Sequence, residues 1–319
     1  MSARDRHTVR IMHIDAAHHG QRLDNYLLGR LKGVPRSHIY RIVRTGQVRI
    51  NKSRVRPSYR LQDGDQVRIP PLRLPRRLPL PPAGLGTDWA KHTLFEDECL
   101  WILDKPAGLA VHAGSGVTFG LIERLRCDRP DSRFLELVHR LDRDTSGCLL
   151  IAKKRSALTR LHEDLRQTSV RSHRVKKRYL ALVRGHWPAS LREIDAPLRK
   201  NAVRAGERRA VVDERGRSAK TRFRPLTYFR DATLVEIVLF TGRTHQARVH
   251  AASAGYPIAG DGKYGDWEFN ARLAAIGLNR LFLHAASLSF RHPTSGARVT
   301  VEAPLPEALL TTLEGLEPA

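Results

Sequence analysis

The sequence predicts an α+β protein, with a small N-terminal domain and a larger domain built on a mixed, mainly antiparallel β-sheet with helices packed around it. In residues 1–72, two stretches with helical apolar spacing precede short strands. Residues 73–90 are rich in proline and lack an apolar period, which predicts a semi-extended linker. In residues 91–319, short strands and glycine turns alternate from about residue 179 onward, and helical periodicity is too sparse there for a doubly wound parallel sheet.

The charge of the chain indicates an anionic partner. The 319 residues carry a formal net charge of +24, and residues 1–79 alone hold 18 Lys and Arg against 5 Asp and Glu, or +13. A polyanion is the natural partner, because each phosphate that such a surface neutralises releases condensed counterions. A genome rich in GC codons would explain the choice of Arg over Lys, but it would not explain the surplus of cations. With 41% hydrophobic residues, the chain has enough apolar material for a substantial core.

Signals for a membrane, for secretion and for a metal are absent from this sequence. No apolar run approaches the roughly 18 residues that suggest a membrane-spanning helix, and no apolar segment follows the charges at the N-terminus. We therefore expect a cytoplasmic protein with no membrane partner. Cys99, Cys127 and Cys148 are far apart and lack metal-type spacing, so we interpret them as reduced, small hydrophobic residues and not as a zinc site.

The N-terminal domain shows two helix signals and two strand signals. Apolar residues at spacing four predict a helix over 22–31, and a second helix is predicted over 37–45 with Gly46 as its stop. Short strands are predicted over 47–50 and 66–69.

This pattern, with Gly-Gln-Val-Arg-Ile-Asn at 46–51 and Asp-Gly-Asp-Gln-Val at 63–67, resembles the S4 RNA-binding domain. The resemblance implies that a basic helix face and the adjoining strand contact the backbone and shape of RNA without reading its sequence. The residues that we assign to this contact are Arg36, Arg41, Arg44, Lys52 and Arg54. The alternative is a solvated basic face without a partner.

The stretch from residue 137 to residue 154 places charged residues between two apolar runs. Residues 148–152 predict a buried strand, and Thr-Ser-Gly at 145–147 predicts a turn that leads into it. The segment 139–144 would then be a loop at the sheet edge, which is a common place for catalytic groups. It contains two carboxylates and two guanidiniums. On residue types alone, an ion-paired surface turn explains it equally well.

The nine residues His-Arg-Leu-Asp-Arg-Asp-Thr-Ser-Gly at 139–147 resemble the signature loop of the RluA family of RNA pseudouridine synthases. The resemblance implies that Asp142, and not Asp144, is the essential catalytic residue. It also implies that Arg140 displaces the target base and fills the gap that the base leaves in the RNA.

Further blocks carry the same resemblance. A strand that runs into a Lys-Pro-x-Gly turn at 100–108 resembles the first motif of these enzymes and suggests packing around the catalytic loop. The resemblance places Tyr179 against the target base, as a stacking face and a candidate base for proton removal. In the block 238–250, Arg243 corresponds to the arginine that pairs with the catalytic aspartate. An adjacent guanidinium would hold Asp142 ionised and fix its orientation.

The stretch 167–176 departs from the family pattern. It is strongly basic, and it is longer than expected between a helix predicted over 158–166 and a strand predicted over 177–183. An added RNA contact and a disordered insertion both remain open for it. His112 and His139 lack partners at metal-ligand spacing, so we interpret both as structural.

The reaction that the resemblance implies is the isomerisation of uridine to pseudouridine within RNA, without a cofactor or a metal. The N-glycosidic bond breaks, the uracil rotates in place, and C5 is joined to the sugar. The base has to leave its stack, which costs a few kcal/mol that stacking and a wedge would offset. Asp142 could attack the ribose carbon, add to the ring or remove a sugar proton, and the sequence does not choose among these.

The order and spacing of the motifs and the overall length are most similar to family members that act on 23S ribosomal RNA. Large-subunit RNA is therefore the expected partner, and a monomer is the expected state. A transfer RNA or small-subunit ribosomal RNA is the alternative substrate. A noncatalytic S4-type ribosome-assembly protein would explain the charge, but not the joint presence of Asp142, Tyr179 and Arg243. A nucleoside hydrolase with an aspartate nucleophile would not need the basic first domain.

Overall fold

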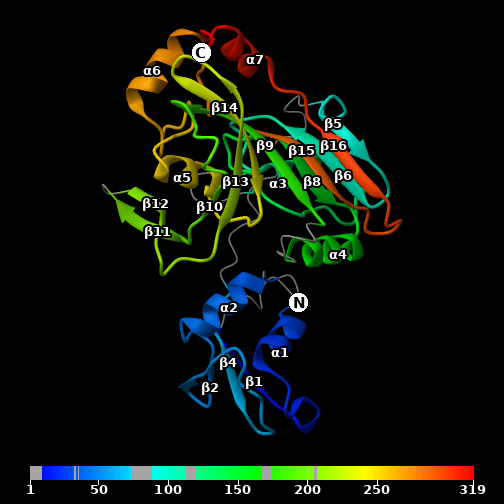
Figure 1. Cartoon of the computed structure of the whole chain (residues 1–319). Coiled ribbons are helices and arrows are strands. Elements are labelled where there is room, and N and C mark those ends of the chain that lie inside the picture. Colours follow the sequence, from blue (N-terminus) through cyan, green and yellow to red (C-terminus); the bar gives the residue numbers. More distant parts are fainter. Residues whose placement is uncertain are drawn as a thin grey trace. The chain divides into compact units, whose positions relative to one another are not determined.

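The structure is a computed structural model that describes residues 9–31, 34, 36–72, 88–112, 119–166, 174–204 and 207–319, without the side chains of 36–37, 201–204 and 207–208. The chain divides into two compact units, Met1–Pro79 and Leu80–Ala319, which we describe separately (Figure 1). Most of the predicted linker over 73–90 lies outside the described residues, and the predicted domain boundaries stay a prediction. In the described part of the chain, no helix combines the length and the apolar character needed to cross a membrane.

The N-terminal unit combines a small antiparallel sheet with two helices. Its elements are β1 (Arg10–His13), η2 (Ala16–His18), α1 (Leu23–Arg30), α2 (Arg36–Arg44), β2 (Arg49–Ile50), β3 (Ser53–Arg54) and β4 (Gln66–Ile69). The strand order is β1-β4-β2-β3, with every pair antiparallel. Leu27 on α1, Ile39 on α2 and Val67 on β4 are 0% exposed and share one apolar cluster, so each helix buries its predicted stripe against the sheet. Both predicted helices are confirmed to within one residue.

The C-terminal unit is built on one ten-stranded sheet. Along the sheet the order is β10 (Glu193–Asp195), β13 (Lys220–Tyr228), β14 (Ala232–Leu239), β9 (Lys176–Arg184), β15 (Leu283–Arg291), β8 (Ser146–Ala152), β6 (Leu100–Lys105) and β5 (Thr93–Glu96), while β16 (Arg298–Glu302) pairs with β15 and β7 (Glu136–Leu137) with β8. β8 and β15 run parallel, and the other pairs are antiparallel. The prediction of a mixed, mainly antiparallel sheet is confirmed.

Apolar side chains cover both faces of this sheet. On β6, Trp101 and Leu103 belong to one buried cluster, whereas Leu100 and Ile102 belong to another. Successive side chains of a strand point to opposite faces, so the sheet separates two cores. Burial of each large aliphatic side chain contributes roughly 1.5–3 kcal/mol. Cys148 joins the second cluster, where burial raises the pKa of its thiol to about 12, and the three cysteines are free, as predicted.

Helices and a separate hairpin complete the C-terminal unit. They are α3 (Leu121–Asp128), α4 (Arg155–Arg166), α5 (Gln246–Ser253), α6 (Trp267–Ala275), α7 (Glu307–Glu314) and the hairpin formed by β11 (Leu198–Arg204) and β12 (Glu207–Val212). The side chain of Asp266 caps α6 by accepting the Phe269 N–H at 2.8 Å. The hairpin packs against α5, and Figure 1 shows the two side by side.

The glycine of the signature loop has a different function from the predicted one. The turn lies at Arg143 and Asp144, and β8 already begins at Ser146. Gly147 is inside the strand with φ of +104°, opposite Ala285 in the parallel pair. A Cβ at this position would lie 2.3 Å from the Ala285 carbonyl oxygen. The sequence places glycine here because two backbones approach closely, and not because the chain turns.

Candidate active site

The loop that carries Asp142 is fixed at both of its ends. His139 Nε2 lies 3.2 Å from the backbone N–H of Leu150 on β8 and accepts its hydrogen bond. The Thr145 N–H donates to the Asp142 carbonyl at 3.2 Å, which closes the turn. Leu141 is buried in the core between these anchors. The side chain of Asp142 is therefore presented from a short segment with little freedom to move.

Lys105 forms a third anchor for this loop. It is 0% exposed, and its Nζ donates to the carbonyl oxygens of Pro106, Leu109 and Arg143 at 2.7, 2.9 and 3.0 Å. Three acceptors match the three hydrogens of an ammonium group. Burial opposes the charge and lowers the pKa of Lys105 to about 7. The Lys-Pro-x-Gly turn thus supports the catalytic loop, as the sequence suggested.

Asp142 lies within ion-pair distance of Arg248, on the first turn of α5. The distance from Arg248 Nη1 to Asp142 Oδ2 is 3.5 Å, and the Asp142 side chain is 27% exposed. Arg248 itself is held by the fully buried Asp261, whose two carboxylate oxygens accept from its Nε and Nη2 at 2.7 Å each. Burial alone would lower the pKa of Arg248, but the pair with Asp261 raises it. A fixed positive charge therefore faces one oxygen of Asp142 and leaves the carboxylate accessible.

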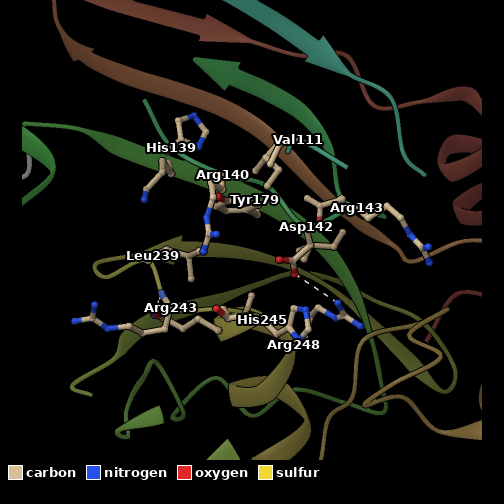
Figure 2. A pocket seen from close by; sticks show the side chains of 18 of the residues that line it. Val111, His139, Arg140, Asp142, Arg143, Tyr179, Leu239, Arg243, His245 and Arg248 are labelled. Atoms are coloured by element: carbon tan, nitrogen blue, oxygen red, sulfur yellow. Dashed lines mark hydrogen bonds and ion pairs between the residues drawn. The ribbon is translucent and has the colours of Figure 1, made fainter. Parts of the chain in front are cut away.

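The expected pair between Asp142 and Arg243 does not form in this structure. Arg243 Nε donates to the Ser218 carbonyl at 2.9 Å, and Figure 2 shows its guanidinium directed away from Asp142. Arg243 lies in the loop before α5, whereas the helix turn carries Arg248 back toward the catalytic loop. Sequence reasoning missed Arg248. The available signal was its position three residues after His245, which places both on one side of a helix start.

Tyr179 projects from β9 toward the catalytic loop. It is 5% exposed, and burial, followed by the charge of Asp142, raises the pKa of its hydroxyl. Lys177 precedes it by two residues and therefore points to the same face of the strand. Burial lowers the pKa of Lys177 to about 8. The phenol of Tyr179 therefore keeps its proton, whereas the ammonium group of Lys177 loses its proton more easily than usual. Both side chains line the same cavity as Asp142.

These side chains surround a cavity of about 650 Å³ (Figure 2). Its lining includes Arg140 and Asp142 from the loop, Tyr179 from β9 and Arg243 before α5, so the structure brings together all four predicted residues. The cationic side chains of the lining are Arg140, Arg143, Lys177, Lys200, Arg243 and Arg248. Among the lining residues that the structure describes, Asp142 is the sole carboxylate. Such a site favours an anionic substrate and offers it one acidic side chain.

The residues predicted to contact RNA in the N-terminal unit are exposed where they are described. Arg41 and Arg44 lie on the exposed face of α2, and Lys52 and Arg54 lie in and beside the turn between β2 and β3. Arg54 also donates to the Thr45 carbonyl at 3.0 Å. The side chain of Arg36 lies outside the described residues. Contact of this surface with RNA stays a prediction.

The basic stretch over 167–176 is described only from Arg174 onward. Arg174 pairs with Asp164 at 3.1 Å. Residues 167–173 lie outside the described part of the chain, so the two interpretations of this stretch stay open.

Comparisons with known proteins agree with these observations. A family profile described as RNA pseudouridylate synthase matches residues 99–253, and a profile described as S4 domain matches residues 21–67. Ribosomal large subunit pseudouridine synthase C of Pasteurella multocida is 53% identical over 300 residues, which cover 93% of this chain and 90% of the relative. The protein of that name from Escherichia coli K12 is 51% identical over 317 residues, or 98% of each chain.

A solved structure has a similar fold over most of the chain. The human protein RNA pseudouridylate synthase domain containing 4 superimposes with a TM-score of 0.57 at 25% identity, over 71% of this chain and 93% of that chain. With identities above 50% over nearly the whole length of its relatives, and with the family loop lining the cavity, the chain belongs to the family of RNA pseudouridine synthases.

Proposed function

We propose that this enzyme converts specific uridines of 23S ribosomal RNA to pseudouridine. The observation that carries the proposal is the identity of 51% over 98% of both chains with a protein named for the ribosomal large subunit. The cavity supports it, since one carboxylate lies among cations in a space that accommodates an extruded nucleotide. The substrate loses a proton from C5 and gains one at N1, so the reaction is an isomerisation.

Asp142 is the proposed catalytic residue. Arg248 pairs with it and fixes its orientation, which is the role that the sequence assigned to Arg243. A carboxylate in this position suits attack on the ribose carbon, addition to the ring or removal of a sugar proton, and the choice among these three steps stays open. Arg140 is exposed at the cavity and extends from the loop. We assign to it the displacement of the target base.

Tyr179 is the proposed stacking face for that base. Its raised pKa makes a free phenolate scarce, so a role in removing the C5 proton requires transfer that is concerted with bond formation. Arg243 lines the cavity without a carboxylate partner in the described chain, so we propose that it binds a phosphate of the RNA.

The N-terminal unit is the proposed RNA-docking module. Arg36, Arg41, Arg44, Lys52 and Arg54 would neutralise phosphates around the target site and set its position without reading bases. We further propose a monomer, because the enzyme has to accommodate a bulky RNA, and residence in the cytoplasm, where ribosomal RNA is found in bacteria.

The proposal is tested with purified enzyme and three protein-free RNAs: 23S ribosomal RNA, 16S ribosomal RNA and a pool of transfer RNAs. We expect pseudouridine at discrete positions of 23S RNA with the native chain, and none with Asp142→Asn. Formation only in another RNA would reject the proposed substrate but keep the reaction. A native chain that binds RNA and modifies none of the three would favour the ribosome-assembly alternative.

A further inference from the structure

His245 lines the active-site cavity, and none of the roles proposed for the reaction involves it. It directly precedes α5 with φ of +55° and ψ of +24°, a left-handed conformation that non-glycine residues seldom adopt. Such backbone strain persists where the surrounding structure imposes it, and it is frequent at functional sites. Figure 2 shows the ring near Asp142 and Arg248.

A chain of hydrogen bonds leads from the β11–β12 hairpin to this ring. The backbone N–H of Ala210 on β12 donates to the hydroxyl oxygen of Tyr264 at 3.0 Å, and the same oxygen lies 2.8 Å from His245 Nδ1. Because the oxygen already accepts from Ala210, its own proton is available for Nδ1. A neutral imidazole that accepts at Nδ1 carries its proton on Nε2.

Tyr264 is itself held in place from several sides. Its backbone N–H donates to Asp261 Oδ1 at 3.0 Å, the carboxylate that also fixes Arg248. Its ring lies 5.1 Å from the Arg248 guanidinium and meets the His245 ring edge-on at 5.5 Å. Burial lowers the pKa of His245, against the opposing charge of Asp142, which is consistent with a neutral ring. Tyr264 is therefore a rigid neighbour of Nδ1, and its contacts favour the tautomer with the proton on Nε2.

His245 Nε2 forms no hydrogen bond with any residue in the described ranges, while the residue lines the cavity. A fixed N–H donor in a pocket that takes a base favours an acceptor on that base. Uracil presents carbonyl oxygens at positions 2 and 4, whereas cytosine replaces the second with an amino group.

We propose that His245 binds a carbonyl oxygen of the target uracil through its Nε2–H, and that Tyr264 is the positioning residue that fixes this tautomer. The inference rests on the action of the enzyme on uridine. It also links the hairpin to the site, because Ala210 on β12 orients the hydroxyl, and Lys200 on β11 lines the same cavity. A donor that faces position 4 would discriminate against cytosine as well.

The tautomer is tested directly by long-range proton–nitrogen NMR spectra of the full chain labelled with 15N-histidine. Loss of a resonance pair in His245→Gln assigns the ring. We expect a protonated Nε2 and an unprotonated Nδ1 in the native chain, and a change of this pattern in Tyr264→Phe. Tyr228→Phe is the matched control, since its hydroxyl donates to the Trp187 carbonyl at 3.0 Å outside the cavity lining. A proton on Nδ1 in the native chain would overturn the inference.

The contact with the base is tested with a matched pair of variants. The amide nitrogen of His245→Gln reaches the place of Nε2, whereas His245→Asn has no group there, although asparagine tolerates the left-handed backbone better. On a 23S RNA fragment that the native enzyme modifies, we expect the single-turnover rate of His245→Asn to fall about tenfold to a hundredfold, and that of His245→Gln to fall much less. The reverse order would indicate a backbone effect and would contradict the inference.

The acceptor is identified with RNA that carries 2-thiouridine or 4-thiouridine at the target position, since sulfur accepts hydrogen bonds weakly. One of the two substitutions should slow the native enzyme by about tenfold and should slow His245→Asn hardly further, because coupled sites are not additive. If each thiouridine slows the native enzyme and His245→Asn by the same factor, His245 does not contact either carbonyl oxygen. If the native chain modifies no 23S RNA, the proposed substrate fails, while the NMR spectra still decide the tautomer.

Discussion

Two arginines lie near Asp142, and they differ in the groups to which they are bound. Arg248 is 7% exposed and bridges the fully buried Asp261 to the carboxylate of Asp142. Arg243 is partly exposed and bound to a carbonyl oxygen. We therefore propose that Arg248 is a structural cation that also orients Asp142, and that Arg243 contacts the substrate.

These positions predict different consequences of substitution. Arg248→Gln leaves the buried carboxylate of Asp261 without its counter-charge, so we expect the free energy of unfolding to fall by about 3–5 kcal/mol and activity to be lost. Arg243→Gln should change the free energy of unfolding by less than about 1 kcal/mol and weaken RNA binding instead. Denaturant titration and a binding assay on both variants check this. A large fall in the free energy of unfolding of Arg243→Gln would show that the guanidinium of Arg243 stabilises the fold.

Tyr179 offers a test of proton transfer at the base. Tyr179→Phe keeps the ring for stacking and removes only the hydroxyl, so the fold should persist. If the hydroxyl takes part in proton transfer, turnover should fall by about a hundredfold or more at unchanged RNA affinity. Single-turnover kinetics measure this effect. Near-native turnover would remove the acid–base role and leave the stacking role.

At the scale of elements, the catalytic loop depends on the β6 terminus through Lys105. The pKa of Lys105 is 10.5 when unperturbed and about 7 in the fold. Between these values the unfolded chain binds a proton that the native chain has released, so the free energy of unfolding rises with pH, by up to about 1.4 kcal/mol per unit. We expect this rise in the native chain, and less of it in Lys105→Met. If the free energy of unfolding depends on pH in the same way in the native chain and in Lys105→Met, the three carbonyl oxygens keep the Lys105 amine charged in the fold.

Contiguous patterns made much of the element structure predictable. Helical apolar stripes predicted α1 and α2, short apolar runs predicted β6 and β9, and the resemblance of the nine-residue loop pointed to Asp142. The structure added the contacts that connect distant segments. Asp142 and Arg248 are 106 residues apart, and Gly147 meets Ala285 only because β8 and β15 pair in parallel. No local spacing contains such contacts, so the ion-pair partner and the function of Gly147 were predicted wrongly.

At the scale of the whole molecule, the charge surplus of the N-terminal unit should govern affinity for RNA. Replacing Arg41, Arg44, Lys52 and Arg54 by Gln in the full chain should weaken binding to 23S RNA. It should also reduce the slope of log K against log salt by about 0.7–0.9 for each phosphate that the protein no longer neutralises. Arg230→Gln with Arg272→Gln is the control, since both arginines pair with carboxylates of the C-terminal unit. An unchanged slope would show that the basic face has no RNA partner.

We propose above that this chain forms pseudouridine in large-subunit ribosomal RNA and that Asp142 is its catalytic residue. Pseudouridine mapping of ribosomal RNA from cells that lack this gene, complemented with the native chain or with Asp142→Asn, tests it most directly. We expect specific 23S positions to lose pseudouridine when the gene is absent, and only the native chain to restore them. Restoration by Asp142→Asn, or a 23S map that does not change when the gene is lost, would contradict it.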